Sequence, residues 1–481
     1  MANLADLFPG APSRDVTGLT ADSRKLQPGS VFVAAPGTKA DGLSFAAAAA
    51  AAGAAAIVGE AARPAGLPDA VPYIQVPDAR RALALAAARL HPGQPETVVA
   101  VTGTSGKSSV ADFTRQLAAA TGHRSASLGT IGVVTSDGAT YGSLTTPDPV
   151  TLHATLDRLA MAGTDFLALE ASSHGIEQRR LDGVKLAAVA FTNLGRDHLD
   201  YHATVEDYLR AKLRLFDTLV DPGRPAIVNA DGDYADSVIA AARQHGLDLR
   251  TTGRFGDTLR LLDAQPDGFG QKLRVSDVRA GVAIDIDLPL AGAFQVENAL
   301  VAAGLVSATT GASLADLRDA LGRLTGVPGR MERVGTVRGA LCIVDYAHKP
   351  EALEHVLSAL RPFATGTLVC VFGCGGDRDR GKRPIMGRIA TERADTVIVT
   401  DDNPRGERPE AIRRAILAAA PGAREIGARA GAIRTAVAGL GPGDVLVVAG
   451  KGHETGQIVG DRTLPFSDHD VIRAAIAEFA R

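Results

Sequence analysis

The sequence predicts an α/β protein of three domains built around mostly parallel sheets. From Val98 onward, short apolar runs alternate with helical stretches, a rhythm typical of a sheet covered by helices on both faces. Turn-rich segments at 91–95 and 327–330 interrupt this rhythm and mark domain boundaries. The 481 residues suit about three domains of ordinary size. We therefore expect domains at residues 1–93, 94–330 and 331–481.

The first domain is predicted to hold short strands between alanine-rich helices. The alanine run Ala46–Ala52 looks like low-complexity sequence, but it suits a helix that packs through small side chains. The strands are expected at Ser30–Ala34, Ala55–Val58 and Tyr73–Val76.

The second and third domains each carry their own set of apolar strands. In the second, strands are expected at Val98–Val101, Phe166–Glu170, Ala187–Asn193 and Ala226–Asn229, with helices after Lys107 and across Val205–Leu219. In the third, they are expected at Leu341–Asp345, Leu368–Phe372, Thr396–Thr400 and Val445–Ala449, which makes this domain Rossmann-like and doubly wound. Polar or glycine-rich residues follow each strand, where open α/β sheets bind ligands.

Composition and charge exclude several classes of protein. A formal net charge of −3 argues against binding to nucleic acid or to an anionic membrane surface. No apolar run reaches the ~18 residues of a membrane span, and no secretory signal opens the chain. The three cysteines, Cys342, Cys370 and Cys374, suit neither a disulfide framework nor a zinc site. We expect a cytoplasmic protein without stable membrane insertion.

A phosphate-binding loop is the most specific motif. The segment Thr102–Ser109 reads TGTSGKSS and directly follows an apolar strand. Backbone N–H groups at the start of the helix face an anion, the lysine reaches the outer phosphates and a hydroxyl meets Mg²⁺. Only two residues separate Gly103 from Gly106, so the general P-loop spacing is absent and a shorter variant is present. We expect the central domain to be a P-loop ATPase-type parallel sheet.

Other polar residues of the central domain allow two interpretations each. Glu170 ends a strand beside this loop and is either a Mg²⁺ ligand or an ordinary helix-capping acid. Residues 195–202 carry two aspartates and two histidines, which suits either metal or phosphate binding or a hydrogen-bonded loop. Lys212 lies on an amphipathic helix, where the pattern alone favours a solvated surface lysine.

Lysine is scarce in this chain, with nine lysines against 42 arginines. Such a chain should keep lysine where a compact or reactive amine is needed, although chance clustering is the alternative. Five of the nine fall in or beside the motifs, namely Lys107, Lys212, Lys349, Lys382 and Lys451.

Ten motifs in order resemble the Mur ligases of peptidoglycan synthesis, over nearly the whole chain. They are TGTSGKSS, TTPDP (145–149), EASSHGIEQRR (170–180), FTNLGRDHLDYH (191–202), AKLRLF (211–216), PGRMERV (328–334), DYAHKPEAL (345–353), GCGGDRDRGKRP (373–384), DDNPR (401–405) and GKGHE (450–454). Folylpolyglutamate synthetases share the short P-loop, but DDNPR and GKGHE are not expected in them.

The resemblance implies an ATP-dependent amide ligase. In such an enzyme ATP phosphorylates the γ-carboxylate of D-glutamate on UDP-N-acetylmuramoyl-L-alanyl-D-glutamate. The amine of meso-diaminopimelate then attacks the acyl phosphate, and the tetrahedral intermediate collapses to amide and phosphate. The resemblance also implies two Mg²⁺ ions and a carbamate, formed from CO₂ on Lys212, that supports the second ion; an arginine there could not form it. We expect a monomer.

Site residues follow from the motif matches. The implied catalytic residues are Lys107, Glu170, His198 and Lys212, and Mg²⁺ is held by Ser108 (or Ser109), Glu170, His198 and Lys212. ATP contacts fall on Gly103, Thr104, Ser105, Gly106, Lys107, Ser108, Ser109, Asn298, Arg330 and His348. The UDP-dipeptide contacts fall on Ser23, Thr145, Thr146, Ser172, Gln178 and Arg180.

Selection of the amino acid is assigned to the DNPR motif. Diaminopimelate differs from lysine by a second carboxylate, which a guanidinium such as Arg405 can bind bidentately. The contacts implied here are Arg383, Asp402, Asn403, Pro404, Arg405, Gly450 and Glu454, the last suited to the distal ammonium. A turn residue after proline is the alternative for Arg405.

Three positions depart from the family pattern. Ser105 and Gln295 stand where asparagine is usual, and Gly195 replaces a common serine. None removes a group that the mechanism needs. Two other functions stay open: a lysine-adding ligase, against which Arg405 speaks, and a non-catalytic sensor of UDP-muramoyl peptides, which would not need all of the implied catalytic residues.

Overall fold

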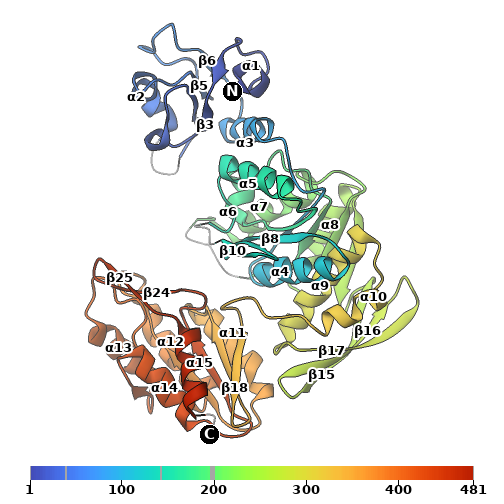
Figure 1. Ribbon diagram of the computed structural model, residues 1–481, viewed down its shortest axis with the longest axis vertical. Coiled ribbons are helices and arrows are strands. Elements are labelled where there is room, and N and C mark those ends of the chain that lie inside the picture. Colours follow the sequence, from blue (N-terminus) through green and yellow to red (C-terminus); the bar gives the residue numbers. More distant parts are fainter. Residues whose placement is uncertain (1, 38–40, 141–143, 196–200, 480–481) are drawn as a thin grey trace. The chain divides into compact units, whose positions relative to one another are not determined.

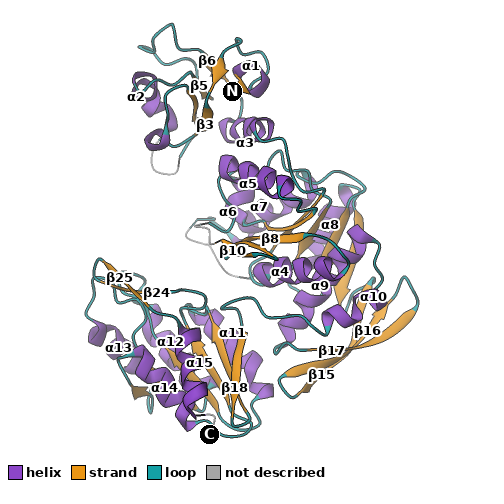
Figure 2. Cartoon of the chain, in the orientation of Figure 1, coloured by secondary structure: helices purple, strands orange, loops and turns teal. Residues whose placement is uncertain are grey.

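The computed structural model describes residues 2–37, 41–140, 144–195 and 201–479 (Figures 1 and 2). The chain separates into two compact units, which are described one at a time. The first comprises Met1–Arg260, Asp277–Ala280 and Leu300–Leu317, and the second Leu261–Ser276, Gly281–Ala299 and Arg318–Arg481. The domain boundaries near residues 94 and 330 remain predictions.

A small parallel sheet forms at the N-terminal end of the first unit. Its strand order is β3 (Gly18–Thr20), β4 (Ser30–Ala34), β5 (Ala56–Gly59) and β6 (Tyr73–Gln75), all paired in parallel. The alanine run forms α2 (Ala46–Ala51), so the helical interpretation is confirmed. The other elements here are β1 (Ala2–Asn3), β2 (Asp15–Val16), α1 (Leu4–Leu7) and α3 (Ala79–Leu90).

The largest sheet contains the phosphate-binding loop. Within the described residues its order is β10-β9-β8-β11-β7-β12-β13-β14-β15-β16-β17. The pairs from β8 through β15 are parallel, while β8–β9 and β9–β10 are antiparallel. The strands are β7 (Thr97–Thr102), β8 (Ser125–Gly129), β9 (Gly132–Thr135), β10 (Gly138–Thr140), β11 (Phe166–Glu170), β12 (Ala188–Phe191), β13 (Pro225–Asn229), β14 (Asp248–Gly253), β15 (Leu259–Asp267), β16 (Gly270–Asp277) and β17 (Val282–Leu288).

Helix boundaries around this sheet follow from local sequence signals. Asp148 caps α5 through the N–H groups of the first turn, and Pro149 occupies that turn without losing a hydrogen bond. Thr204 caps α7 in the same way, accepting from Asp207 N–H. The helices are α4 (Lys107–Ala120), α5 (Pro149–Met161), α6 (Ser173–Glu177), α7 (Val205–Asp217), α8 (Ala235–Gln244), α9 (Ala293–Thr310) and α10 (Leu314–Leu321).

The second unit carries a doubly wound sheet with two apolar cores, one on each face. Its order is β18-β19-β23-β20-β21-β22, parallel except for the β18–β19 pair. The strands are β18 (Glu332–Val337), β19 (Ala340–Asp345), β20 (Leu368–Phe372), β21 (Thr396–Val399), β22 (Arg424–Glu425) and β23 (Val445–Ala449), followed by the hairpin β24 (Gly456–Val459) and β25 (Arg462–Pro465). The helices are α11 (Pro350–Leu360), α12 (Lys382–Arg393), α13 (Pro409–Leu417), α14 (Arg429–Gly439) and α15 (Asp468–Phe479).

The predicted α/β class and the predicted strands are confirmed to within a residue or two at their ends. The sequence did not predict β8 or β14, nor the largely exposed strands such as β10 and β15. Residues of β15 beyond Leu261 are mostly exposed, and β10 is exposed throughout. Such strands lack the continuous apolar runs by which buried parallel strands are found.

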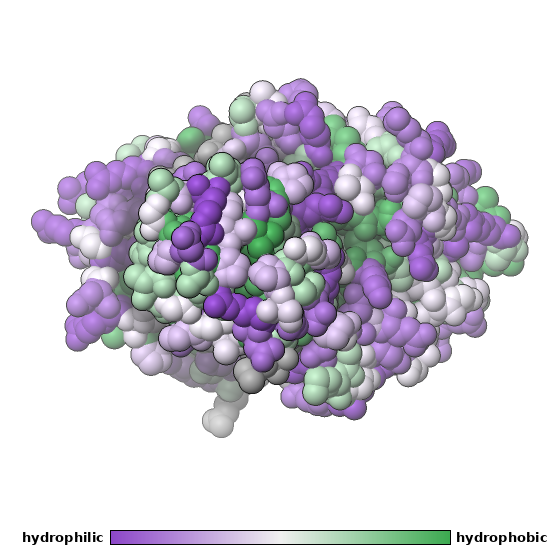
Figure 3. All heavy atoms as spheres, turned by 90° about the horizontal axis from the view of Figure 1, so that it is seen from above, coloured by the Kyte–Doolittle hydropathy of each residue, from purple (hydrophilic) through white to green (hydrophobic). Residues whose placement is uncertain are grey.

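Polar side chains dominate the face drawn in Figure 3, with smaller hydrophobic patches between them. No described helix is both long enough and apolar enough to cross a membrane.

A buried ion pair joins the last two helices of the second unit. Arg429, the first residue of α14, donates from Nε and Nη2 to both oxygens of Asp468 at 2.7 and 2.8 Å. Both side chains are fully buried. Nη2 also donates to the carbonyl of Ala449 at 3.0 Å, so the guanidinium ties both helices to the end of β23.

Replacing Arg429 with methionine should therefore destabilise the protein strongly. A carboxylate left unpaired inside a protein costs about 3–5 kcal/mol of unfolding free energy. Arg434→Met is the matched control, because Arg434 pairs with Glu478 across the same two helices but in solvent. Its cost should stay below about 1 kcal/mol. Urea unfolding measures both, and equal losses would contradict the assignment.

Candidate active site

Residues 103–106 form a compact turn between β7 and α4. Gly106 caps α4 with a φ of 86°, a left-handed conformation that glycine adopts without strain. A side chain at Gly103 would collide with the Thr192 hydroxyl, so glycine is required there too. The helix that starts at Lys107 has fourteen residues and directs its first N–H groups to the turn. This geometry suits the binding of a phosphate group.

The end of β12 holds the phosphate-binding loop in place. Thr104 N–H donates to the Asn193 carbonyl at 2.8 Å, and Ser105 N–H donates to Asn193 Oδ1 at 3.0 Å. The Thr192 hydroxyl donates to the Ser105 carbonyl at 2.6 Å. Gly195 N–H donates to the Thr104 hydroxyl at 2.9 Å. Asp197, His198 and Asp200 lie outside the described residues, so both interpretations of the 195–202 segment remain predictions.

Two lysines meet at one carbonyl of this loop. Lys107 Nζ donates to the carbonyls of Gly103 and Thr104, each at 2.8 Å. Lys212 Nζ, from α7, donates to the same Gly103 carbonyl at 2.8 Å. Lys212 is only 1% exposed, and its ammonium lies 4.3 Å from the centre of the Tyr208 ring. The interpretation of Lys212 as a solvated surface residue is therefore wrong.

Glu170 lies at the end of β11, next to the strand that leads into the loop. Its carboxylate is buried and accepts hydrogen bonds from the N–H of Thr130 at 2.8 Å and from the Thr130 hydroxyl at 3.2 Å. A side chain at Gly129 would collide with this carboxylate. Glu170 contacts Thr130, just after β8, rather than capping a helix, and its carboxylate is a hard oxygen donor of the kind that Mg²⁺ prefers.

A polar network extends from Glu170 through most of the predicted UDP-dipeptide contacts. The Thr146 hydroxyl donates to the Glu170 carbonyl at 2.9 Å and lies 3.0 Å from the Ser172 hydroxyl. Arg180 donates to the Thr146 carbonyl at 2.6 Å and to the Gln178 side chain at 2.7 Å. Thr145 joins this network because its hydroxyl lies 3.0 Å from the Thr130 hydroxyl.

Among the described residues, one predicted contact, Ser23, is not part of this network. His198 lies outside the described residues. Ser23 begins a short 3₁₀ helix, Ser23–Lys25, and its side chain has no hydrogen bond to the network among the described residues. Within those residues no group of three or more acidic, histidine or cysteine side chains could by itself hold a metal ion.

In the second unit, the predicted ATP contacts Arg330 and His348 meet at Tyr346. The Arg330 guanidinium lies 4.7 Å from the centre of the Tyr346 ring, and the His348 ring lies 4.6 Å from it. Burial, aided by the charges of Lys382, Lys349 and Arg330, lowers the pKa of His348 below its ordinary value. The third contact, Asn298, is buried on α9.

The departure at Gln295 now has a structural role. The Asn298 side chain donates to Gln295 Oε1 at 3.1 Å, and both residues are buried. Gln295 therefore orients the asparagine that the family retains.

The predicted amino-acid contacts cluster at the ends of β21 and β23. Asp402 and Asn403 are buried, and the Asn403 side chain donates to Glu454 Oε2 at 2.9 Å. A Cβ at Gly450 would lie 2.6 Å from Asp402 Oδ2, so the two loops touch there. Arg405 has a φ of 50°, which is unusual for a residue other than glycine. Strain of this kind accumulates at functional sites.

Arg383, on α12, belongs to the same cluster through Glu407. Its guanidinium donates to both Glu407 oxygens at 2.8 and 3.1 Å. The Nε–H of Arg383 is a buried donor without a hydrogen-bond partner among the described residues.

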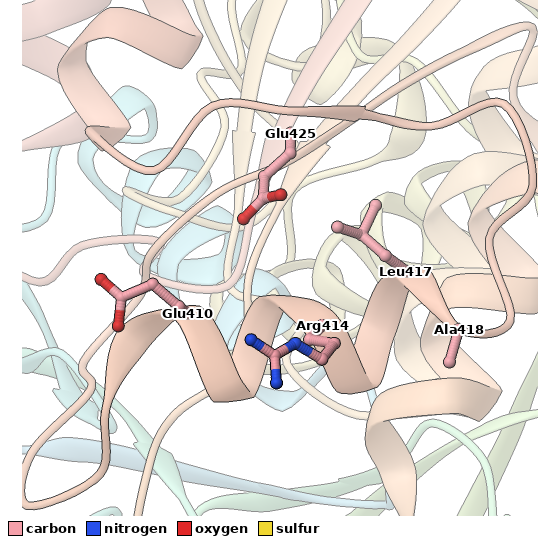
Figure 4. Close-up of a pocket in the computed structure, with 5 residues that line it drawn as sticks. All are labelled: Glu410, Arg414, Leu417, Ala418 and Glu425. Carbon is pink, nitrogen blue, oxygen red and sulfur yellow. The ribbon is translucent and has the colours of Figure 1, made fainter.

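A surface hollow of about 440 Å³ lies elsewhere, along α13 (Figure 4). Its lining residues are Glu410, Arg414, Leu417, Ala418 and Glu425, none of which is a predicted site residue.

Sequence reasoning missed several supporting residues, notably Tyr208, Asn193, Thr130 and Tyr346. Tyr208 contacts the Thr104 hydroxyl at 3.2 Å and lies under Lys212. A tyrosine four residues before Lys212 on one helix face was the available signal.

Comparisons with known proteins cover almost the whole chain. Three family models match: the Mur ligase family catalytic domain at residues 15–91, the Mur ligase middle domain at 101–306 and the Mur ligase glutamate ligase domain at 329–452.

Individual proteins agree with these models. A Mesorhizobium japonicum protein named UDP-N-acetylmuramoyl-L-alanyl-D-glutamate–2,6-diaminopimelate ligase is 58% identical, over 100% of this chain and 99% of its own length. A solved structure of a ligase with that name aligns with a TM-score of 0.74 and 33% identity, covering 99% of both chains. A Thermotoga maritima MurF ligase in complex with ADP shares the fold at a TM-score of 0.59 and 20% identity, covering 97% of both chains.

Glu407 should make the free energy of unfolding depend on pH. The hydrogen bond from Arg383 is the main cause that lowers the Glu407 pKa from 4.5 to about 2. Because the folded-state pKa is depressed, the ion pair stabilises the folded state above pH 4.5 and loses that effect as the pH falls through 2. The stability gap between the wild type and Glu407→Gln should thus narrow over this window. Urea titrations at several pH values measure the gap, and one that is independent of pH would contradict the pairing.

Proposed function

The chain belongs to the Mur ligase family, and we propose that it is the ATP-dependent ligase that adds meso-diaminopimelate to UDP-N-acetylmuramoyl-L-alanyl-D-glutamate. The observation that carries the proposal is 58% identity over the full chain to a protein named for this reaction. The reaction belongs to the synthesis of the peptidoglycan precursor. We also propose that the protein acts in the cytoplasm as a monomer.

The chain's own groups suit each step of an acyl-phosphate reaction. The turn at Gly103–Gly106 and the start of α4 would bind the phosphates of ATP, and Lys107 would leave its loop carbonyls to contact the outer phosphates. The γ-carboxylate of D-glutamate would receive the phosphate, and the amine of diaminopimelate would then displace it. The network from Thr145 to Arg180 would orient the UDP-dipeptide.

Mg²⁺ would be held by Ser108, Glu170, His198 and, for a second ion, a carbamate on Lys212. When bound, the metal would screen the repulsion between the phosphates and the substrate carboxylate. The buried Glu170 carboxylate and its neighbouring Thr130 hydroxyl support this assignment. A carbamate on Lys212 would replace a second cation beside the Gly103 carbonyl with an anion, which relieves the crowding of like charges there.

Arg405 would select diaminopimelate over lysine by binding the carboxylate that only diaminopimelate has. Its guanidinium now donates to the Gly376 carbonyl at 3.0 Å, a neutral partner that a carboxylate would displace. The other assigned contacts, Arg383, Asp402, Asn403, Pro404, Gly450 and Glu454, surround the same loop ends.

Phosphate release tests this proposal against the two other functions. With ATP and UDP-dipeptide, release is expected on addition of diaminopimelate and not on addition of lysine, and mass spectrometry should identify the tripeptide product. Release with lysine would favour the lysine-adding ligase. Release with neither amino acid would favour the sensor.

Arg405→Ala should raise the KM for diaminopimelate and leave the KM for ATP nearly unchanged. Losing a buried charge-assisted pair costs about 2–4 kcal/mol, or roughly 30- to 800-fold in KM. Arg408→Ala is the matched control, because Arg408 is exposed three residues further on. If steady-state kinetics gave the same KM for diaminopimelate in both variants, Arg405 would not bind this substrate.

Lys212→Arg should abolish turnover although the positive charge is kept, because a guanidinium does not form a carbamate. Lys185→Arg, at an exposed lysine, is the control and should retain full activity. Thermal unfolding checks that each variant is folded, because Lys212 is buried. Lys212→Ala should regain part of the rate in formate or acetate.

Labelling with ¹³CO₂ gives an independent readout of the carbamate. The wild type should show a carbamate signal by NMR that Lys212→Ala lacks. Full activity in Lys212→Arg, or the same signal in both proteins, would exclude the carbamate at this residue.

A further inference from the structure

Lys451 is a fully buried lysine in the GKGHE motif to which the proposed reaction gives no role. Its side chain is 0% exposed, although a charged amine inside a protein is costly unless it is hydrogen-bonded. It lies two residues after β23, beside the loop that carries the amino-acid contacts. In a chain with only nine lysines, this position calls for an explanation.

The ammonium of Lys451 bridges the two amino-acid-binding loops. Nζ donates to Asn403 Oδ1 and to Glu454 Oε2, each at 3.0 Å. Asn403 follows β21, and β20 lies between β21 and β23 in the sheet. Lys451 thus links loops that leave strands which are not neighbours.

These contacts define how the Asn403 amide is oriented. Oδ1 accepts a hydrogen bond from Lys451 and another from the N–H of Ile458 at 2.9 Å. Because both partners are donors, the amide atom that faces them must be the oxygen. The NH₂ end must then face Glu454, to which it donates at 2.9 Å. An amide turned over would place its NH₂ group against the ammonium.

The same contacts leave one oxygen of Glu454 available. Oε2 accepts from Lys451 and from Asn403, whereas Oε1 accepts no hydrogen bond among the described residues. The Glu454 side chain is 33% exposed, so Oε1 can meet a ligand from solvent. A carboxylate oxygen that is accessible and accepts no other hydrogen bond can accept one from an ammonium group.

The hairpin that follows Lys451 completes the support of this loop. Gln457 donates from its side chain to the Asp402 carbonyl at 2.7 Å. Arg405 N–H donates to the Ile458 carbonyl at 3.1 Å, and Gly460 N–H donates to the Arg405 carbonyl at 2.8 Å. The backbone of the loop is therefore held by residues 457–460, and the Asn403 side chain is held by Lys451.

We propose that Lys451 is a positioning residue that orients Asn403 and Glu454 for the ammonium group of the incoming amino acid. The proposal rests on the proposed function, because it concerns how that amino acid is bound. Lys451 acts through these two side chains and needs no contact with the substrate itself. Its removal should therefore weaken amino-acid binding and spare the chemical step.

The test compares Lys451→Met, Glu454→Gln and the double variant with the wild type in the full-length protein. Phosphate release is measured against diaminopimelate concentration at saturating ATP and UDP-dipeptide. Lys451→Met should raise the KM for diaminopimelate about tenfold, with kcat within about twofold and the KM for ATP unchanged. The surface control Lys272→Met, at an exposed lysine paired with Asp267, should change none of these.

The double variant separates positioning from general damage. If Lys451 acts through Glu454, Lys451→Met should add less than about twofold to KM once Glu454→Gln is present. The proposal would be overturned if the KM increases of the two single variants multiplied fully in the double variant. It would also be overturned if Lys451→Met left the KM unchanged or lowered only kcat. A wild type that does not use diaminopimelate would instead refute the proposed function.

A second variant covers the case in which Lys451→Met does not fold. Lys451→Gln keeps a donor for Asn403 but lacks the charge, and the same rise in KM is expected from it. Failure of both variants to fold, while Glu454→Gln does fold in thermal unfolding, would overturn the proposal, because Lys451 would then have only a structural role.

Discussion

In-register parallel pairing brings the polar ends of neighbouring strands to one edge of each sheet, and the phosphate-binding loop and the amino-acid-binding loops depend on it. Glu170 pairs with Val101 and Phe191 with Thr102, so the phosphate-binding loop, the Glu170 carboxylate and the Asn193 segment leave the sheet together. In the second unit, Asp345 pairs with Ala449, which sends two further loops out side by side. A register slip of one residue would turn Glu170 to the opposite face and remove it from the loop.

Buried or half-buried cations are the second common feature. Lys107 and Lys212 share a loop carbonyl, Lys451 bridges an amide and a carboxylate, and Arg429 is enclosed with Asp468. Burial of charge is tolerated because each cation has oxygen partners, and it fixes those partners in return. Lys107 and Lys212 each present a compact point charge to a loop carbonyl, whereas Arg429 presents a planar fork to both oxygens of Asp468.

Continuous apolar runs allowed the buried parallel strands to be predicted. Strands β4, β11, β20 and β23 are at the expected bounds, and each is buried along its length. The β15–β17 segment was not predicted, since β15 is mostly exposed beyond Leu261 and polar residues alternate with apolar ones in β16 and β17. These two strands bury alternate residues, a pattern of period two that contains no continuous apolar run.

By itself, the sequence determined the α/β class, the phosphate-binding loop and the order of the motifs, because these depend on residues close together in the chain. Tertiary structure alone decided what surrounds them. Lys212 reaches the Gly103 carbonyl across 109 positions, and Lys451 reaches Asn403 across 48. Periodicity shows which face of a helix or strand is buried, but not which strand becomes its neighbour. Lys212 shares a helix face with the buried Tyr208, Leu215 and Phe216, but only the tertiary structure showed which carbonyl its ammonium meets.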